Sequence, residues 1–184
     1  MDDRADSGYT LVELLVTLAV LAILTTVALP AFTDLIDNQR LRAAAQQIAT
    51  DLRYARGESI KRHTSTPIGV SFSPGDQWCY GISQQLPCDC RVQDPAHADA
   101  CRLDLSQQRQ LHAPRPHAHI ALIDARFSGT QTTAFDPLRG SARAGSVALR
   151  SARGKQLEVR VSTLGRVRIC APADGLSPAG YAPC

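Results

Sequence analysis

The first long apolar segment of the chain runs from Tyr9 to Leu29. At about 1.5 Å of rise per residue, a helix of this length spans roughly 30 Å, the thickness of the hydrocarbon core of a bilayer. The preceding MDDRAD is acidic and no small-x-small cleavage site follows, so the pattern disfavours a secretory signal peptide. Residues 9–29 are predicted to form a membrane-spanning helix with one carboxylate, Glu13, near its start.

The helical pattern continues beyond this segment. Pro30 should kink the helix, but no turn-forming cluster follows it. An apolar stripe instead recurs at alternating spacings of four and three residues and consists of Leu41, Ala45, Ile48, Leu52 and Ala55. The polar residues expected on the other faces include Asp37, Gln47, Asp51 and Arg56. We predict one helix from Tyr9 to about His63, in which residues 30–63 are an amphipathic continuation packed on a globular domain.

Beyond Pro67 the pattern changes to a period of two, which is typical of strands. Ile68, Val70 and Phe72 alternate with small or polar residues, SPGD predicts a turn, and QWCYGIS alternates again, so this stretch is predicted to form a hairpin. Residues 84–116 are irregular and are predicted to be a loop. Further strands are expected at 119–127, 146–151, 156–163 and 166–171. The fold class is α+β, with one long helix against the antiparallel sheet of a domain formed by residues 67–184.

Charge is unevenly distributed along a chain whose net charge is +3. Residues 139–169 hold eight basic side chains and one acid, Glu158. After Gly165, which permits a tight turn, alternation places Arg166 and Arg168 on one exposed face, while Val167 and Ile169 face the core. The remaining basic residues expected on this face or at the hairpin turn before it are Arg160, Arg153 and Lys155.

Several guanidinium groups on one face can bind phosphates, because the planar fork matches phosphate geometry. The window from 139 to 169 has no aromatic residue for base stacking, so binding should follow backbone charge rather than sequence. Two other readings stay open: a solvated, merely basic sheet face, or arginines that pair with a neighbouring subunit. Ser162 and Thr163 precede this strand, but no histidine or carboxylate is placed to activate them, so no enzymatic activity is expected.

Six cysteines in a chain of this size indicate an oxidising compartment. A zinc site is the alternative, with His112, His117 and His119 near Cys101. However, the C-x-C spacing at Cys88 differs from the C-x2-C of common zinc sites, so we expect disulfides and no metal or cofactor. The four cysteines whose pairing has three possible connectivities are Cys79, Cys88, Cys90 and Cys101.

Gly8 followed by YTLVELL resembles the class III signal of type IV pilins and pseudopilins. The resemblance implies that residues 1–8 are a leader, which a prepilin peptidase removes between Gly8 and Tyr9, and that the new N-terminus is methylated. Tyr9 stands where most members have phenylalanine. Glu13 would be the fifth residue of the mature chain, and in the filament it would pair with the N-terminus of a neighbouring subunit. Such a buried pair can set axial register.

The globular part resembles the GspH-like FimT/FimU minor pilins. The matching pieces are WCYG at 78–81, Cys88-Asp-Cys90 with Cys101, FDP at 135–137 with Gly140, and STLGRVRIC at 162–170. The resemblance implies a Cys170–Cys184 disulfide, and it implies that Gly165, Arg166 and Arg168 form a GRxR motif that binds DNA during natural transformation.

The implied protein is a minor pilin of a type IV pilus that helps assembly and binds double-stranded DNA through its phosphate backbone. Its implied partners are other minor and major pilins, the prepilin peptidase and the inner-membrane assembly platform. The chain would be a single-pass inner-membrane protein with its C-terminal domain in the periplasm, and would enter the pilus fibre or tip after assembly. The alternatives are a minor pilin with only an assembly role and a GspH-like minor pseudopilin of a type II secretion system.

Overall fold

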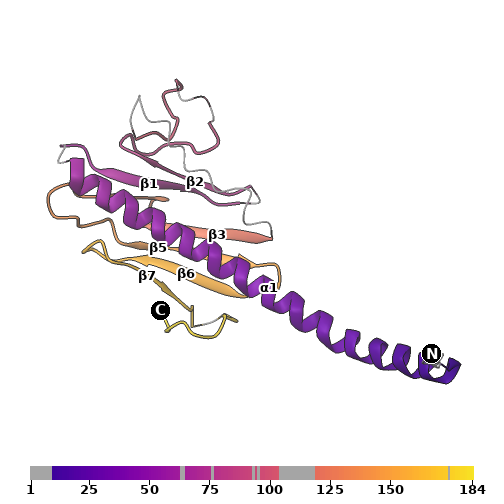
Figure 1. Cartoon of the computed structure of the whole chain (residues 1–184). Helices are drawn as coiled ribbons and strands as arrows, with labels where there is room; N and C mark the ends of the chain where they lie inside the picture. The colour runs from indigo at the N-terminus through magenta and orange to yellow at the C-terminus, as the bar shows by residue number, and fades with distance from the viewer. Residues whose placement is uncertain are drawn as a thin grey trace, which may run out of the picture. The chain divides into compact units, whose positions relative to one another are not determined.

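The computed structural model describes residues 10–62, 65–75, 77–92, 94, 96–103, 119–173 and 175–184 of the 184-residue chain. The elements within these residues are α1 (Leu11–Arg62), β1 (Ile68–Ser73), β2 (Cys79–Ser83), β3 (Ile120–Phe127), β4 (Thr132–Phe135), β5 (Gly145–Ser151), β6 (Gln156–Val161) and β7 (Val167–Cys170) (Figure 1). The chain divides into two compact units, residues 1–36 and residues 37–184.

The first unit contains the N-terminal part of α1. The backbone amide of Glu13 donates to Thr10 Oγ1 at 3.3 Å, and Thr-x-x-Glu is the spacing of a helix capping box. The helix is continuous through Pro30, whose carbonyl accepts a hydrogen bond from Thr33 Oγ1 at 2.9 Å. An 18-residue stretch of the helix has a mean hydropathy of 2.4 and none of it is buried, so α1 is long and apolar enough to cross a membrane.

The second unit contains two antiparallel sheets, with strand orders β2-β1-β4 and β3-β5-β6-β7. The predicted hairpin is β1–β2, and the four further predicted strands are β3, β5, β6 and β7. The sequence pattern predicts one sheet and does not predict β4. This strand has only four residues, and it pairs with β1, which lies about sixty residues earlier, so local alternation carries little signal for it.

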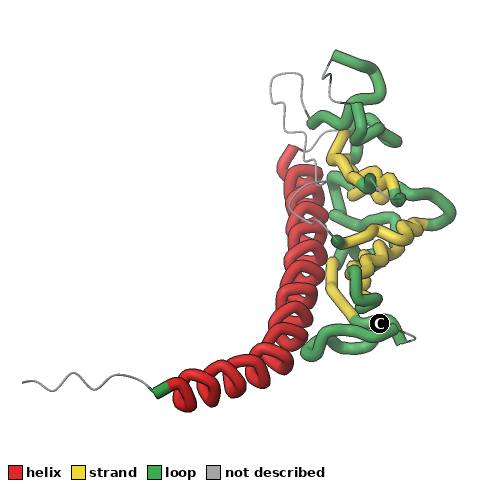
Figure 2. Tube along the Cα trace, turned by 90° about the vertical axis from the view of Figure 1, so that its right-hand side faces the viewer, coloured by secondary structure: helices red, strands yellow, loops and turns green. Residues whose placement is uncertain are grey.

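The C-terminal part of α1 covers one face of the two sheets (Figure 2). The predicted stripe is confirmed, because Leu41, Ala45, Ile48, Leu52 and Ala55 are all buried. The expectation that Asp37 and Asp51 lie on the outer faces of the helix is wrong. Both are buried against the sheets. There, Ser151 Oγ donates to Asp37 at 2.6 Å and Tyr80 Oη donates to Asp51 at 2.6 Å. Opposing hydroxyl groups satisfy these carboxylates, which a hydropathy pattern cannot indicate.

The outer faces of the two sheets differ in how they are covered. On the β2-β1-β4 sheet, a Cβ placed on Gly81 would lie 2.3 Å from Cys101 Sγ, and Cys88 N donates to Ser71 Oγ at 3.0 Å. The loop segments that carry Cys88 and Cys101 therefore pack directly on this sheet. On the other sheet, the outward residues of β5, β6 and β7 include exposed or half-buried arginines. The outward face of the β3-β5-β6-β7 sheet is therefore accessible to a binding partner.

All six cysteines form disulfides. The structure pairs Cys79 with Cys90 and Cys88 with Cys101, which selects one of the three connectivities that the sequence leaves open. Cys170 pairs with Cys184, as the family resemblance implies. The four clustered cysteines are buried together, and their thiols are not available to a metal ion. His112 and His117 lie outside the described residues.

The Tyr80–Asp51 hydrogen bond should make stability sensitive to alkaline pH. Burial, together with the hydrogen bond to Asp51 and its charge, raises the pKa of Tyr80 above its usual value. The unfolded chain releases this proton near pH 10 and the folded chain does not, so the stabilisation is present below about pH 10 and is lost as the pH rises further.

Tyr80→Phe should lower the free energy of unfolding by about 1.5–3 kcal/mol at pH 7, the usual value of a hydrogen bond to a charged group. It should also flatten the alkaline loss of stability by up to about 1.4 kcal/mol per pH unit. Denaturant unfolding between pH 7 and pH 11 measures both effects. Parallel pH profiles for the wild type and the variant would contradict the assignment.

Candidate nucleic-acid interface

The β6–β7 turn positions the arginines of the candidate site. Gly165 N donates to Ser162 O at 2.8 Å, and Ser162 N donates to Arg166 O at 3.0 Å, so the connection is a three-residue hairpin loop. Such loops end in a residue with left-handed backbone, which favours glycine, and Gly165 has φ of 71°. The conformation of this turn therefore explains why the first residue of GRVR is a glycine.

Gly165 also packs against a second loop and against α1. A Cβ at this position would lie 2.1 Å from Gly140 O and 2.9 Å from Arg56 Nε. Arg56 Nε in turn donates to Gly140 O at 3.0 Å. The turn is thus fixed to the helix through a contact with no space for a side chain, and it holds Arg166 in a defined place.

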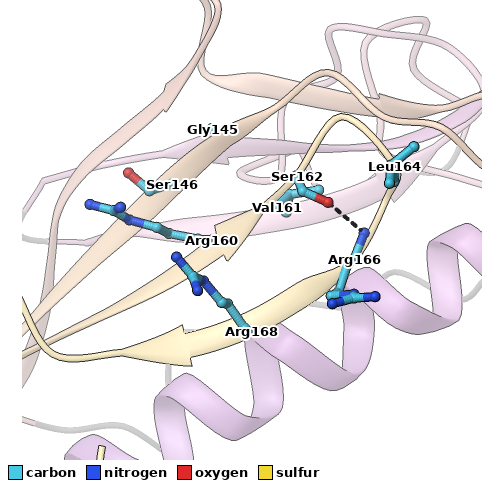
Figure 3. A pocket seen from close by; sticks show the side chains of 8 residues that line it. All are labelled: Gly145, Ser146, Arg160, Val161, Ser162, Leu164, Arg166 and Arg168. Carbon is cyan, nitrogen blue, oxygen red and sulfur yellow. Dashed lines mark hydrogen bonds between the residues drawn. The ribbon is translucent and has the colours of Figure 1, made fainter. Parts of the chain in front are cut away.

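The side chains of Arg160, Arg166 and Arg168 line one open groove on the outer side of the β3-β5-β6-β7 sheet. The groove has a volume of about 610 Å³ and is completed by Gly145, Ser146, Val161, Ser162 and Leu164. In Figure 3, Arg160 and Arg168 extend in the same direction toward Ser146, and the Arg166 guanidinium lies apart from them and points away from Leu164. Register explains the pairing, because Arg160 and Arg168 are directly opposite each other on β6 and β7.

The three arginines differ in the contacts they make. Arg160 donates from Nε to Glu158 Oε2 at 2.9 Å and from Nη1 to Cys184 O at 2.9 Å. Arg168 Nη2 donates to the same Cys184 oxygen at 3.3 Å. The Arg166 backbone amide donates to Ser162 Oγ, while its guanidinium makes no hydrogen bond or ion pair with any described residue. Arg166 is therefore fully available to a ligand, and the other two retain part of their donors.

Arg153 and Lys155 do not join the groove. They lie in the β5–β6 turn, at the other end of β6 from Gly165, and about 17 Å of strand separates the two ends. Lys155 Nζ donates to Asn38 Oδ1 on α1 at 2.9 Å. The prediction that these two residues lie in the hairpin turn before β6 is confirmed, and this turn and the next turn of the meander lie at opposite ends of their common strand.

Sequence reasoning did not find Ser146 or the Cys184 main-chain oxygen. Ser146 enters the groove because it is directly opposite Arg160 in the β5–β6 pairing. The length of the ARGK turn could have indicated this register. The Cys184 oxygen reaches the arginines through the Cys170–Cys184 disulfide, which no local pattern places next to β6.

The structure places the other predicted site residues only in part. Gly8 and Tyr9 lie outside the described residues. Glu13 lies in the first turn of α1 and is exposed in the single chain. Glu158 lies close to Cys170 and Cys184, but both sulfurs are in a disulfide, so this group does not offer thiolate ligands to a metal.

Known families match both the N-terminal segment and the globular part of the chain. The family model described as Type II transport protein GspH matches residues 44–165, and the prokaryotic N-terminal methylation motif matches residues 3–29. A protein of Xanthomonas campestris pv. campestris named Type II secretion system protein H is 42% identical over 67 residues. That match spans 36% of this chain and 38% of the relative.

Two crystal structures of the type IV minor pilin FimU of Pseudomonas aeruginosa are similar to the fold. Their sequence identities are 17% and 16%, and their TM-scores are 0.47 and 0.48. The alignments cover 73% and 72% of this chain and 94% and 98% of the FimU chains.

Proposed function

The chain belongs to the GspH family of minor pilins and pseudopilins, and from this we propose that it is a type IV pilus minor pilin that binds double-stranded DNA. The ligand is the phosphate backbone, and the binding surface is the groove of Arg160, Arg166 and Arg168. Binding serves DNA uptake in natural transformation.

One observation carries the DNA proposal: three guanidinium groups, from β6, from β7 and from the residue just before β7, line a single solvent-facing groove. No acidic side chain is among the described residues that line it. Each arginine that neutralises a phosphate releases about 0.9 counterion on average, which lowers the affinity as salt rises. At about 0.1 M salt, the loss of one such contact corresponds to roughly an eightfold loss of affinity. The lining residues include no aromatic side chain, so little discrimination between base sequences is expected.

The N-terminal methylation motif and the long apolar helix support a membrane anchor before assembly. We assign the processing site to the Gly8–Tyr9 bond, methylation to the new amino terminus of Tyr9, and the periplasm to the C-terminal domain. In the fibre, the Glu13 carboxylate would lose water when helices bundle, and the charged N-terminus of a neighbouring subunit would compensate it. Other pilins, the prepilin peptidase and the assembly platform are the partners in this scheme. The chain acts as a structural and binding subunit rather than as a catalyst.

The second candidate is a minor pseudopilin of a type II secretion system. The 42% identity to the Xanthomonas protein over 67 residues favours it. In that role the arginines would contact neighbouring pseudopilins or secreted proteins. A third possibility is a minor pilin with an assembly role alone, in which the same arginines are buried against other minor pilins.

The double variant Arg166→Ala/Arg168→Ala separates these functions in cells. We expect normal pili and lost DNA uptake, because both side chains are exposed and lie outside the core. Loss of pili together with uptake would support the assembly role, and loss of protein secretion would support the pseudopilin role. The matched control is Arg150→Ala, which removes an exposed arginine of the same sheet that does not line the groove.

A further inference from the structure

The outer face of the four-stranded sheet carries a continuous basic row that extends past the groove. Register places Arg126 of β3 opposite Ser146 of β5, Ser146 opposite Arg160 of β6, and Arg160 opposite Arg168 of β7. The inward neighbours of these residues, such as Val147, Val159 and Val167, are buried, so the four members of the row share the outward face. The Arg126 side chain is 82% exposed.

The two arginines of the row that follow an acid are held in the same way. Arg126 pairs through Nε with Asp124, and Arg160 pairs through Nε with Glu158, in each case two residues earlier on the strand. A guanidinium has five N–H donors, so a bond at Nε leaves the terminal nitrogens available to a second anion. The acids therefore orient both side chains without using up their donors.

The acids form a parallel row of their own. Asp124 is opposite Ala148, and Ala148 is opposite Glu158, so the Cα atoms of the two acids lie about 7 Å along the strands from those of the basic row. Their carboxylates reach back to the Nε atoms of Arg126 and Arg160. A polyanion laid along the strands would cross this acidic row. A polyanion laid across the strands follows the basic row and meets the terminal guanidinium nitrogens that the acids leave free. With strands about 4.8 Å apart, the row is roughly 14 Å long, so more than one phosphate of a DNA strand can lie along it.

We propose that the phosphate backbone of DNA crosses all four strands of this sheet, and that Arg126 is a further phosphate-contacting residue at its far edge. The row formed by Arg126, Ser146, Arg160 and Arg168 sets the direction of the duplex. This inference rests on the proposed function, because it takes DNA as the ligand of the groove.

The test is a binding titration of a short labelled DNA duplex with the full chain in nonionic detergent, at several salt concentrations. Arg126→Ala should weaken binding about eightfold at 0.1 M salt and lower the slope of log affinity against log salt by about 0.9. Arg126→Lys, which keeps the charge, should bind within about twofold of the wild type. Thermal melting of each variant shows whether the fold is retained.

Arg150→Ala is the matched control, because Arg150 lies on the same face of β5 but about 13 Å along the strand from Ser146. It should change affinity by less than about twofold, since it lies outside the row. Equal effects of Arg126→Ala and Arg150→Ala, or no effect of either, would overturn the row while leaving the groove intact. Absence of binding by the wild-type chain at low salt would overturn both the row and the proposed function.

Discussion

Replacing Gly8 with alanine should leave the N-terminal segment on the chain, because the peptidase that acts on this motif reads the glycine before the cut. Intact-mass measurement of the membrane-extracted protein should then show Met1 retained, whereas the wild type should begin at a methylated Tyr9. The variant should show only the mass of the uncut chain, and uncut chains should be absent from fibres. A wild-type N-terminus anywhere other than Tyr9 would contradict the assigned processing site.

Glu13→Ala is the matched control, because it changes the same motif without changing the cleavage bond. We expect this variant to be cut normally and to insert in the membrane. Its incorporation into fibres should be impaired, since the N-terminal amine of a neighbouring subunit would then be buried without a partner, which typically costs about 3–5 kcal/mol. Normal incorporation would show that the carboxylate does not set axial register. The role of Glu13 would then be limited to capping the start of the helix together with Thr10.

Gly165→Ala should strongly destabilise the globular domain. Alanine at a positive φ costs about 1–2 kcal/mol, and its Cβ would overlap Gly140 O, which adds about 1–3 kcal/mol of overpacking. For a domain of this size the melting temperature should fall by about 5–15 °C. The turn must also move, so DNA binding through Arg166 should weaken.

Gly154→Ala separates the two causes of that loss. Gly154 has φ of 81°, like Gly165, but nothing lies within 4 Å of the position of its Cβ. This variant should therefore lose only the backbone component, about 1–2 kcal/mol, and should keep DNA binding. Equal losses in the two variants would show that the contact between Gly165 and Gly140 contributes nothing.

Periodicity predicted most of the fold because burial follows it directly. The stripe from Leu41 to Ala55 is buried on α1, and the alternation of Leu157, Val159 and Val161 correctly identifies the inward face of β6. Periodicity did not predict the division into two sheets, because the β4–β1 pairing joins segments about sixty residues apart. It also misplaced Asp37 and Asp51, whose burial depends on hydroxyl groups of distant strands.

The candidate site was predicted in part. Alternation correctly identified Arg160, Arg166 and Arg168 as outward residues, because strand geometry alone fixes their face. It placed Arg153 and Lys155 in the turn before β6, and the structure adds that this turn does not contribute to the groove at the other end of the strand. Cross-strand register, which depends on every turn between the strands, was needed to bring Arg126 and Ser146 into line with Arg160.

The most direct test of the arginine groove is the salt dependence of duplex binding by the full chain. Affinity should be measured from low to physiological salt for the wild type and for Arg166→Ala/Arg168→Ala, with two duplexes of unrelated sequence. We expect a straight line of log affinity against log salt with a slope of about −2.7 for the wild type from the three groove arginines, or about −3.6 if Arg126 also contacts a phosphate. The slope for the variant should be smaller in magnitude by about two. Both duplexes should give the same lines. Identical slopes for the two proteins, or no binding by the wild type at low salt, would contradict a phosphate-binding groove at Arg166 and Arg168.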